Sequence, residues 1–162
     1  MIVIDTDILS MFAKADMIDL LKSVLSARAV MTPIIRLEIS VPLEFGYEFP
    51  HRVISSIRTV QLSEQAIEEF ERLQENLNLG KGELQAIAYC KKENALFATN
   101  DIKARKVAKT EGVSVISLQA ILKAIWKKGI RNKKEVKGLI NKLKEVDNLE
   151  LSSEVERKIF KE

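Results

Sequence analysis

Residues 1–10 read MIVIDTDILS, an apolar run that ends at two aspartates. The β-branched residues at 2–4 have the composition of a strand that is buried on both faces. Apolar residues then recur at helical spacing from Leu9 to Val24, which predicts a helix after a short polar turn. A buried strand that leads through a turn into a helix is the repeating unit of a parallel sheet.

The same unit recurs along the chain. Thr32 and Pro33 open a helix as its N-cap and first residue, and Pro42 ends or kinks that helix. The stretch 45–52 contains glycine and proline and is the most loop-like part of the chain. The sequence predicts further strands at 29–31, 59–62, 95–99 and 113–116, and further helices at 63–73, 83–93, 102–111 and 118–128. This alternation predicts a three-layer α/β/α fold with a short central parallel sheet.

The C-terminal part of the chain departs from this alternation. Two helical stretches follow one another there, and Ser152 or Ser153 begins the second, with Glu156 behind it in a capping-box pattern. We expect residues 1–130 to form the α/β domain and residues 131–162 to form a helical extension packed on the same domain.

The composition limits the chemistry that is available. No apolar run approaches the roughly 20 residues that a membrane span needs, and the first residues lack the basic stretch of a secretion signal. Cys90 is the only cysteine, so we expect a cytoplasmic protein without an internal disulfide. With one histidine and one cysteine, the chain lacks the ligands of a nitrogen–sulfur zinc site, and any metal ion must be bound by oxygen. The abundance of lysine (18) and glutamate (17) hints at a thermophilic source.

Acidic side chains lie where two predicted strands end. Asp5 and Asp7 follow the first strand, and Asp101 follows the strand at 95–99. In open α/β sheets, ligands bind at the carboxyl ends of the strands. Glu38 and Glu83 lie on predicted helices among apolar neighbours, which favours a carboxylate that points at a partner. The simpler interpretation is that Asp5 and Asp101 cap the helices that follow them. In the same way, Glu83 would be favoured in the first turn of its helix by the helix dipole alone.

Four stretches resemble the successive motifs of PIN-domain nucleases, a family that includes VapC-like toxins of prokaryotic toxin–antitoxin pairs. They are IVIDTDILS (2–10), TPIIRLEIS (32–40), LGKGELQAIAYCKK (79–92) and LFATNDIKARKVA (96–108), and they occur in the family's order. The resemblance covers roughly residues 1–125, and the extension also looks like that of one prokaryotic PIN subgroup. It places the four family acids at Asp5, Glu38, Glu83 and Asp101. Glu44 lies near the second of them but falls beyond Pro42, so we prefer Glu38.

The resemblance implies a PIN-like fold and a metal-dependent endoribonuclease. It implies that the four acids are catalytic and bind Mg²⁺ or Mn²⁺, and that four more polar residues orient the ligands or the substrate: Thr6, Asp7, Thr99 and Asn100. Converging carboxylates repel one another by roughly 3–4 kcal/mol per pair at about 4–5 Å, so such a cluster must bind cations or stay partly protonated. Hard divalent cations prefer oxygen ligands, and they supply a deprotonated water for attack on a phosphodiester. The resemblance also suggests an antitoxin and a homodimer as partners.

Basic residues that could bind the phosphates of RNA are concentrated in the later part of the chain. Residues 1–100 carry a net charge of −4 and residues 101–162 a net charge of +7. Lys103, Arg105 and Lys106 follow Asp101 directly, so we expect them to bind RNA phosphates. Residues 123–144 are also rich in lysine, and a solvated helix face explains that stretch equally well.

Two other interpretations use the same acids. A catalytically silent PIN-like module would bind RNA or a protein without cutting it. An aspartate-phosphorylated signalling domain also clusters acids at strand ends, but it needs a lysine after the last strand, where this chain has VSVISLQ (113–119). The sequence therefore favours a nuclease.

Overall fold

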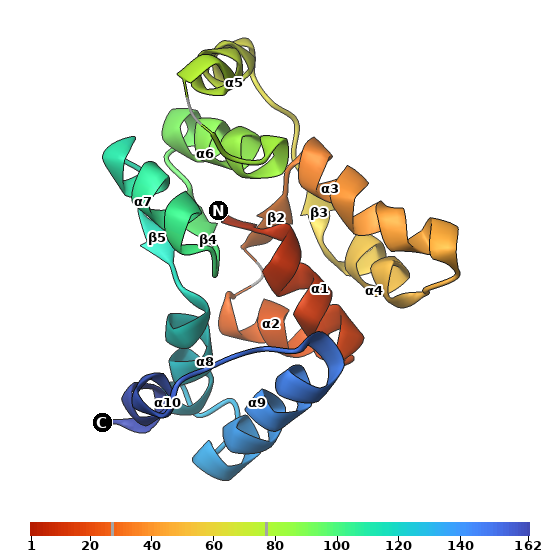
Figure 1. Ribbon diagram of the computed structural model, residues 1–162, viewed down its shortest axis with the longest axis vertical. Helices are drawn as coiled ribbons and strands as arrows, with labels where there is room; N and C mark the ends of the chain where they lie inside the picture. Colours follow the sequence, from red (N-terminus) through yellow and green to blue (C-terminus); the bar gives the residue numbers. More distant parts are fainter. Residues whose placement is uncertain (27, 77) are drawn as a thin grey trace.

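The computed structural model describes residues 1–26, 28–76 and 78–162. Its centre is a parallel sheet in the strand order β3-β2-β1-β4-β5 (Figure 1). The strands are β1 (Ile2–Ile4), β2 (Ala29–Met31), β3 (Arg58–Thr59), β4 (Leu96–Ala98) and β5 (Val115–Ile116). The chain builds outward from β1 to β3 on one side and then returns to place β4 on the other side. The strand order therefore reverses between β1 and β4, and such a reversal opens a crevice at the carboxyl ends of those two strands.

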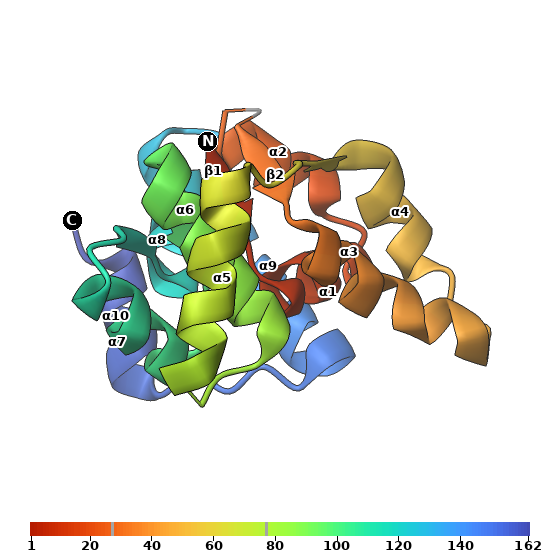
Figure 2. The same cartoon turned by 90° about the horizontal axis from the view of Figure 1, so that it is seen from above.

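Helices cover both faces of the sheet, as the alternating pattern predicts. The helices before β4 are α1 (Thr6–Lys14), α2 (Ile18–Val24), α3 (Pro33–Ser40), α4 (Phe49–Ser56), α5 (Glu64–Asn76) and α6 (Lys81–Glu93). Those after it are α7 (Ile102–Thr110), α8 (Leu118–Lys127), α9 (Lys133–Asp147) and α10 (Ser153–Phe160). Figures 1 and 2 show α5 and α6 on one side of the sheet, and Figure 1 shows α1, α2 and α8 on the other. The three-layer prediction is confirmed.

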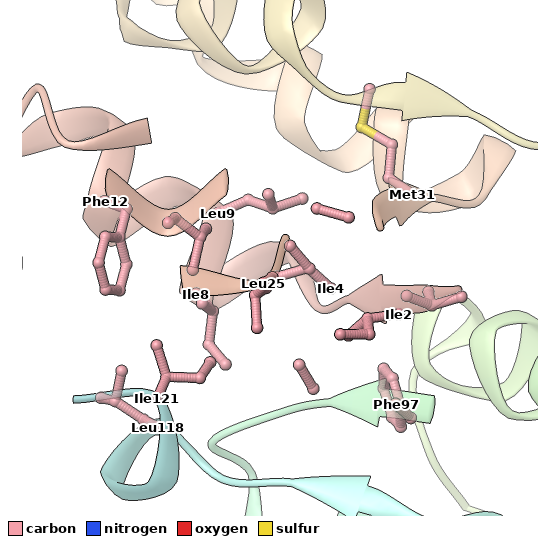
Figure 3. Close-up of a cluster of buried hydrophobic side chains, with 14 of the residues drawn as sticks. Ile2, Ile4, Ile8, Leu9, Phe12, Leu25, Met31, Phe97, Leu118 and Ile121 are labelled. Carbon is pink, nitrogen blue, oxygen red and sulfur yellow. The ribbon is translucent and has the colours of Figure 1, made fainter. Parts of the chain in front are cut away.

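The core forms where the strands meet these two layers. Side chains of β1, β2 and β4 are buried together with apolar side chains of α1 and α8 (Figure 3). Val3, Ile4 and Phe97 have no exposed surface, which explains why their strands read as continuous apolar runs. The rigid sheet thus fixes the residues that directly follow β1 and β4.

Three local predictions need correction. The helical stretch from Leu9 to Val24 is two helices, because the chain breaks between α1 and α2, where Asp16 adopts a left-handed conformation (φ 57°). The loop predicted at 45–52 contains the start of α4, and Pro50 occupies the first turn of that helix, a position that proline favours. The strand predicted at 59–62 is shorter than expected, because β3 begins one residue earlier, at Arg58, and ends at Thr59.

The start of α3 differs from the prediction in its side-chain contacts. Thr32 is the N-cap residue and Pro33 follows it, as expected, but the Thr32 hydroxyl does not cap the helix. Instead, the Gln85 side chain accepts a hydrogen bond from the backbone N–H of Ile34 at 2.8 Å. Pro42 lies in a 3₁₀ turn (Val41–Phe45) directly after α3, which confirms that the α-helix ends there. These contacts hold α3 against α6.

The C-terminal helices pack on the α1 and α8 side of the molecule. Helix α9 lies against α1 and α8, and α10 lies against α8 (Figure 1). The Lys14 ammonium and the Asp147 carboxylate form an ion pair at 2.6 Å that joins α1 to the end of α9. Helix α10 begins after Ser152, whose hydroxyl accepts from the backbone of Val155, so the capping box expected with Glu156 does not form. No helix of the described residues is both long and apolar enough to cross a membrane.

Candidate active site

The predicted acids lie along the carboxyl edge of the sheet. Asp5 directly follows β1, and Asp101 follows β4 after two residues. These are the neighbouring strands between which the strand order reverses. Glu38 and Glu83 come from α3 and α6, the pair of helices that pack against each other beside this edge. Four chain segments that are far apart in sequence therefore meet at one place.

Asp5 is the most buried of these acids, with 5% of its surface exposed. One carboxylate oxygen accepts a hydrogen bond from the Thr99 hydroxyl at 2.7 Å, and the other accepts from the backbone N–H of Thr6 at 2.8 Å. Burial raises the pKa of Asp5 to about 6, although both hydrogen bonds favour the charged form. The nearby charges of Asp7 and Glu38 add to this increase.

Thr99 connects the first acid to the fourth. Its hydroxyl is fully buried, donates to Asp5 and accepts a hydrogen bond from the backbone N–H of Asp101 at 3.2 Å. This hydroxyl fixes the distance between the turns that follow β1 and β4. The prediction that Thr99 orients an acid is consistent with these two contacts.

Glu83 lies in the first turn of α6 and is half-buried. Burial raises its pKa to about 7, and the charges of Asp5 and Asp101 contribute to the increase. Its Oε2 atom is buried and has no hydrogen-bond partner among the described residues. An unpartnered, buried carboxylate oxygen is costly, and a bound cation would remove that cost.

Glu38 is positioned by two neighbours. Its Oε1 atom accepts a hydrogen bond from the Thr6 hydroxyl at 3.0 Å. The same oxygen packs against Gly82 so closely that a Cβ atom at that position would lie 2.0 Å from it. Loss of hydration raises the pKa of Glu38, the Thr6 hydrogen bond opposes the increase, and the charge of Asp7 adds to it. Sequence reasoning missed Gly82, although a glycine one residue before a helical glutamate was the signal that could have identified it.

Asp101 also acts as a helix cap, which confirms the simpler interpretation of this residue in part. Its side chain accepts a hydrogen bond from the backbone N–H of Ala104 at 2.7 Å, at the start of α7. Asp5 likewise accepts from Thr6 at the start of α1. Asp101 has a second carboxylate oxygen, and each oxygen of Asp5 has more than one lone pair, so capping a helix does not prevent either residue from binding a ligand.

Two further predicted residues lie beside the acids. Asp7 lies in the first turn of α1, and partial loss of hydration together with the charges of Asp147 and Asp101 raises its pKa. Asn100 is half-buried in the turn between β4 and α7. Asp147, which no sequence pattern singles out, adds a negative charge from α9 near this group.

The predicted RNA-binding residues lie on α7. Lys103 and Lys106 are exposed, whereas Arg105 is half-buried. One guanidinium nitrogen of Arg105, Nη1, is buried without a hydrogen-bond partner in the described part of the chain. These residues place positive charge on the helix that Asp101 caps.

The donor set fits a hard divalent cation in its chemistry. All four acids supply oxygen, and Glu83 already presents an unpartnered oxygen. As the side chains stand, however, no group of three or more acidic, histidine or cysteine residues within 1–26, 28–76 and 78–162 is arranged to hold a metal ion. In this arrangement Glu38 contacts the Thr6 hydroxyl, and Glu83 contacts the Gly80 backbone.

A comparison with protein-family models identifies the family of the chain. The family model DUF3368, described as a PIN domain, matches residues 1–162. The chain belongs to the PIN family. PIN domains are in general nucleases that use divalent metal ions, so a nuclease-type function is indicated. The PIN match extends through α9 and α10. Comparisons with curated proteins and with solved structures found no match.

Proposed function

We propose that this PIN-family protein is an endoribonuclease that hydrolyses RNA phosphodiester bonds with Mg²⁺ or Mn²⁺. The observation that carries the proposal is the unpartnered, buried Oε2 atom of Glu83, whose pKa burial and the nearby charges of Asp5, Asp101 and Asp7 raise to about 7. A site that only caps helices has no use for a glutamate held at such a cost.

The proposed roles follow from the contacts of each residue. Asp5 and Asp101 bind the cation directly, and Glu38 and Glu83 complete its ligands directly or through water. Thr99 and Thr6 hold the ligand carboxylates by the hydrogen bonds described above, and Asp7 and Asn100 line the entry. Lys103, Arg105 and Lys106 bind phosphates of the substrate. When bound, the metal ion supplies an activated water and offsets the negative charge of the scissile phosphate.

Cleavage of a labelled single-stranded RNA, with and without Mg²⁺ or Mn²⁺, tests the proposal. We expect Asp5→Asn and Asp101→Asn to lower the cleavage rate at least about 100-fold, the scale on which one electrostatic contact in a transition state acts. Asp19→Asn, which changes an exposed aspartate on α2, is the matched control and keeps the wild-type rate. Full activity in either site variant would exclude the assignment, and RNA binding without cleavage in the wild type would favour the catalytically silent module.

The biological context that we propose is the toxin of a cytoplasmic toxin–antitoxin pair. Resemblance to VapC-like PIN toxins supports this context, as does the single cysteine, which is buried. The partners would be an antitoxin and a second copy of the chain. Expression in a bacterial host is expected to arrest growth, and co-expression of an antitoxin encoded next to this protein is expected to relieve the arrest. Normal growth on expression of an active enzyme would contradict the toxin role.

A further inference from the structure

A cavity of about 520 Å³ lies between α9 and α10, in the C-terminal extension. This volume falls within the range of ligand sites in proteins, which is roughly 300–1,000 Å³. Residues that line it include Lys137, Ile140, Asn141, Arg157, Phe160 and Lys161. The cavity belongs to none of the segments that carry the four acids, so it is separate from the candidate active site.

The charge of this α9–α10 cavity is positive. Lys137, Arg157 and Lys161 form no ion pair within the part of the chain that the structure describes. Glu156 also lines the cavity, but its carboxylate is bound by Lys144. Three positive charges with no acidic partner among the described residues therefore line the cavity, which favours an anionic ligand.

An apolar floor accompanies these charges. Ile140 is 2% exposed, and Phe160 is partly buried against the core. The Lys137 ammonium lies over the Phe160 ring, 5.2 Å from its centre, so a base that stacks on this ring takes the place of that ammonium. An aromatic face for stacking, next to cations that bind phosphate, is the combination by which proteins hold single-stranded nucleic acids. The Asn141 amide adds a donor and an acceptor for a base edge.

The cavity and the acids lie toward the same side of the molecule. Asp147 ends α9 and is bound to Lys14 of α1, the helix that Asp5 caps. Asn141 precedes Asp147 by six residues, which is about 9 Å along a helix. The end of α9 is therefore joined to the helix that Asp5 caps, and α9 leads back from there to the residues that line the cavity.

We propose that the α9–α10 cavity is a second RNA-binding site, which holds one nucleotide of a single-stranded RNA while another part of that strand lies at the acids. This inference rests on the proposed function and extends it, because it assigns the C-terminal extension to substrate binding. Lys137, Arg157 and Lys161 bind the phosphates, and the base stacks on Phe160.

RNA binding without cleavage tests the inference separately from catalysis. The probe is a fluorescent single-stranded RNA of about 12 nucleotides, a length that a single-strand binding site covers, in EDTA so that no cleavage occurs. We expect the triple variant Lys137→Ala, Arg157→Ala, Lys161→Ala to weaken binding at least about tenfold. The plot of the logarithm of affinity against the logarithm of salt concentration should become less steep by about 2. Each contact to a single-strand phosphate contributes about 0.7 to this slope, and the variant removes three such contacts. The matched control changes two exposed lysines and one exposed arginine outside the cavity: Lys127→Ala, Arg131→Ala, Lys134→Ala.

The outcomes separate the two proposals. Selective weakening in the cavity variant, with Arg157→Lys close to wild type and unchanged circular dichroism, supports the second site. Equal loss of RNA affinity in the cavity and control variants would overturn it, because binding would then depend only on the net charge of the protein. If the wild type binds and cleaves RNA and the cavity variant binds it unchanged, the second site is wrong and the nuclease proposal stands. If a polyglutamate peptide binds the cavity and RNA does not, the cavity is a docking site for an acidic protein. If the wild type neither binds nor cleaves RNA, both proposals fail.

Discussion

At the scale of single residues, the charged forms of two carboxylates at the carboxyl edge of the sheet lower the stability of the folded protein. The pKa of Asp5 rises to about 6 and that of Glu83 to about 7, so neither carboxylate is stabilised by its surroundings at neutral pH. Both lie near other acids, and neither is paired with a lysine or arginine in the described residues. A protein that needed only stability at these positions would gain from neutral side chains.

Gly82 tests whether the place of Glu38 matters. A Cβ atom at this residue would lie 2.0 Å from the Glu38 carboxylate, so Gly82→Ala must displace that side chain. Alanine is favoured over glycine in helices by up to about 1 kcal/mol, so we expect unchanged or slightly higher stability in urea unfolding. The cleavage rate should nevertheless fall at least about tenfold, because a misplaced catalytic group is costly.

Gly138→Ala is the matched control for this prediction. Gly138 lies in α9, and a Cβ atom there meets nothing within 4 Å. This variant should gain similar stability and keep the wild-type cleavage rate. Wild-type cleavage by Gly82→Ala would show that Glu38 does not take part in the site.

At the scale of elements, an ion-pair cluster joins α5, α6 and α7. Glu69 of α5 is 7% exposed and binds Arg72 and Lys91, and both of these cations also bind Glu111, which follows α7. Hydrogen bonds from Arg72 and Lys91 lower the pKa of Glu69 to about 2, although burial opposes them. The pKa of Glu111 is lowered by the same two cations. The cluster holds α5 onto α6 and so supports the helix that carries Glu83.

The pH dependence of unfolding follows from these shifts. Because the folded pKa of Glu69 lies below its unfolded value of 4.5, its contribution is present above pH 4.5 and is lost as the pH falls toward 2. The loss is at most about 3 kcal/mol. The pKa of Glu83 is raised instead, so protonation of that group adds stability as the pH falls from 7 toward 4.5. In EDTA, we therefore expect the unfolding free energy to pass through a maximum near the lower end of that window.

Urea unfolding as a function of pH checks this expectation. Glu69→Gln should abolish most of the decline below pH 4.5, whereas Glu68→Gln, which changes the exposed neighbour, should leave it intact. If the unfolding free energy of the Glu69→Gln variant declined below pH 4.5 as in the wild type, the cluster would contribute no stability.

Elements also show why the sequence predicted some features and not others. The strands were predictable because short apolar runs between helical stretches have few alternatives, and the acids that follow them were placed by the topology. The sequence does not reveal the start of α4, because proline is typical of loops and also occupies first helical turns, as Pro50 does here. The cluster of Glu69 joins residues that are 3, 22 and 42 positions apart along the chain, and no local pattern identifies such a group.

At the scale of the whole molecule, the acidic first part and the basic second part of the sequence contribute to different binding functions in our proposals. The acids that we assign to the metal ion come mostly from the first hundred residues, and the cations of α7 and of the α9–α10 cavity come from the rest. The net charges of −4 and +7 were evident in the sequence, but the cavity was not, because it depends on how two separate helices pack. The PIN match over residues 1–162 includes both parts.

Binding of Mn²⁺ tests most directly whether the four acids form one cation site. Titration of the protein, followed by the electron paramagnetic resonance signal of free Mn²⁺, measures affinity without any RNA. We predict that the wild type binds Mn²⁺ in competition with Mg²⁺, and that Asp5→Asn and Asp101→Asn each weaken binding at least about tenfold. Asp19→Asn should bind as the wild type does. Equal affinity in the wild type and both site variants would contradict the shared cation site.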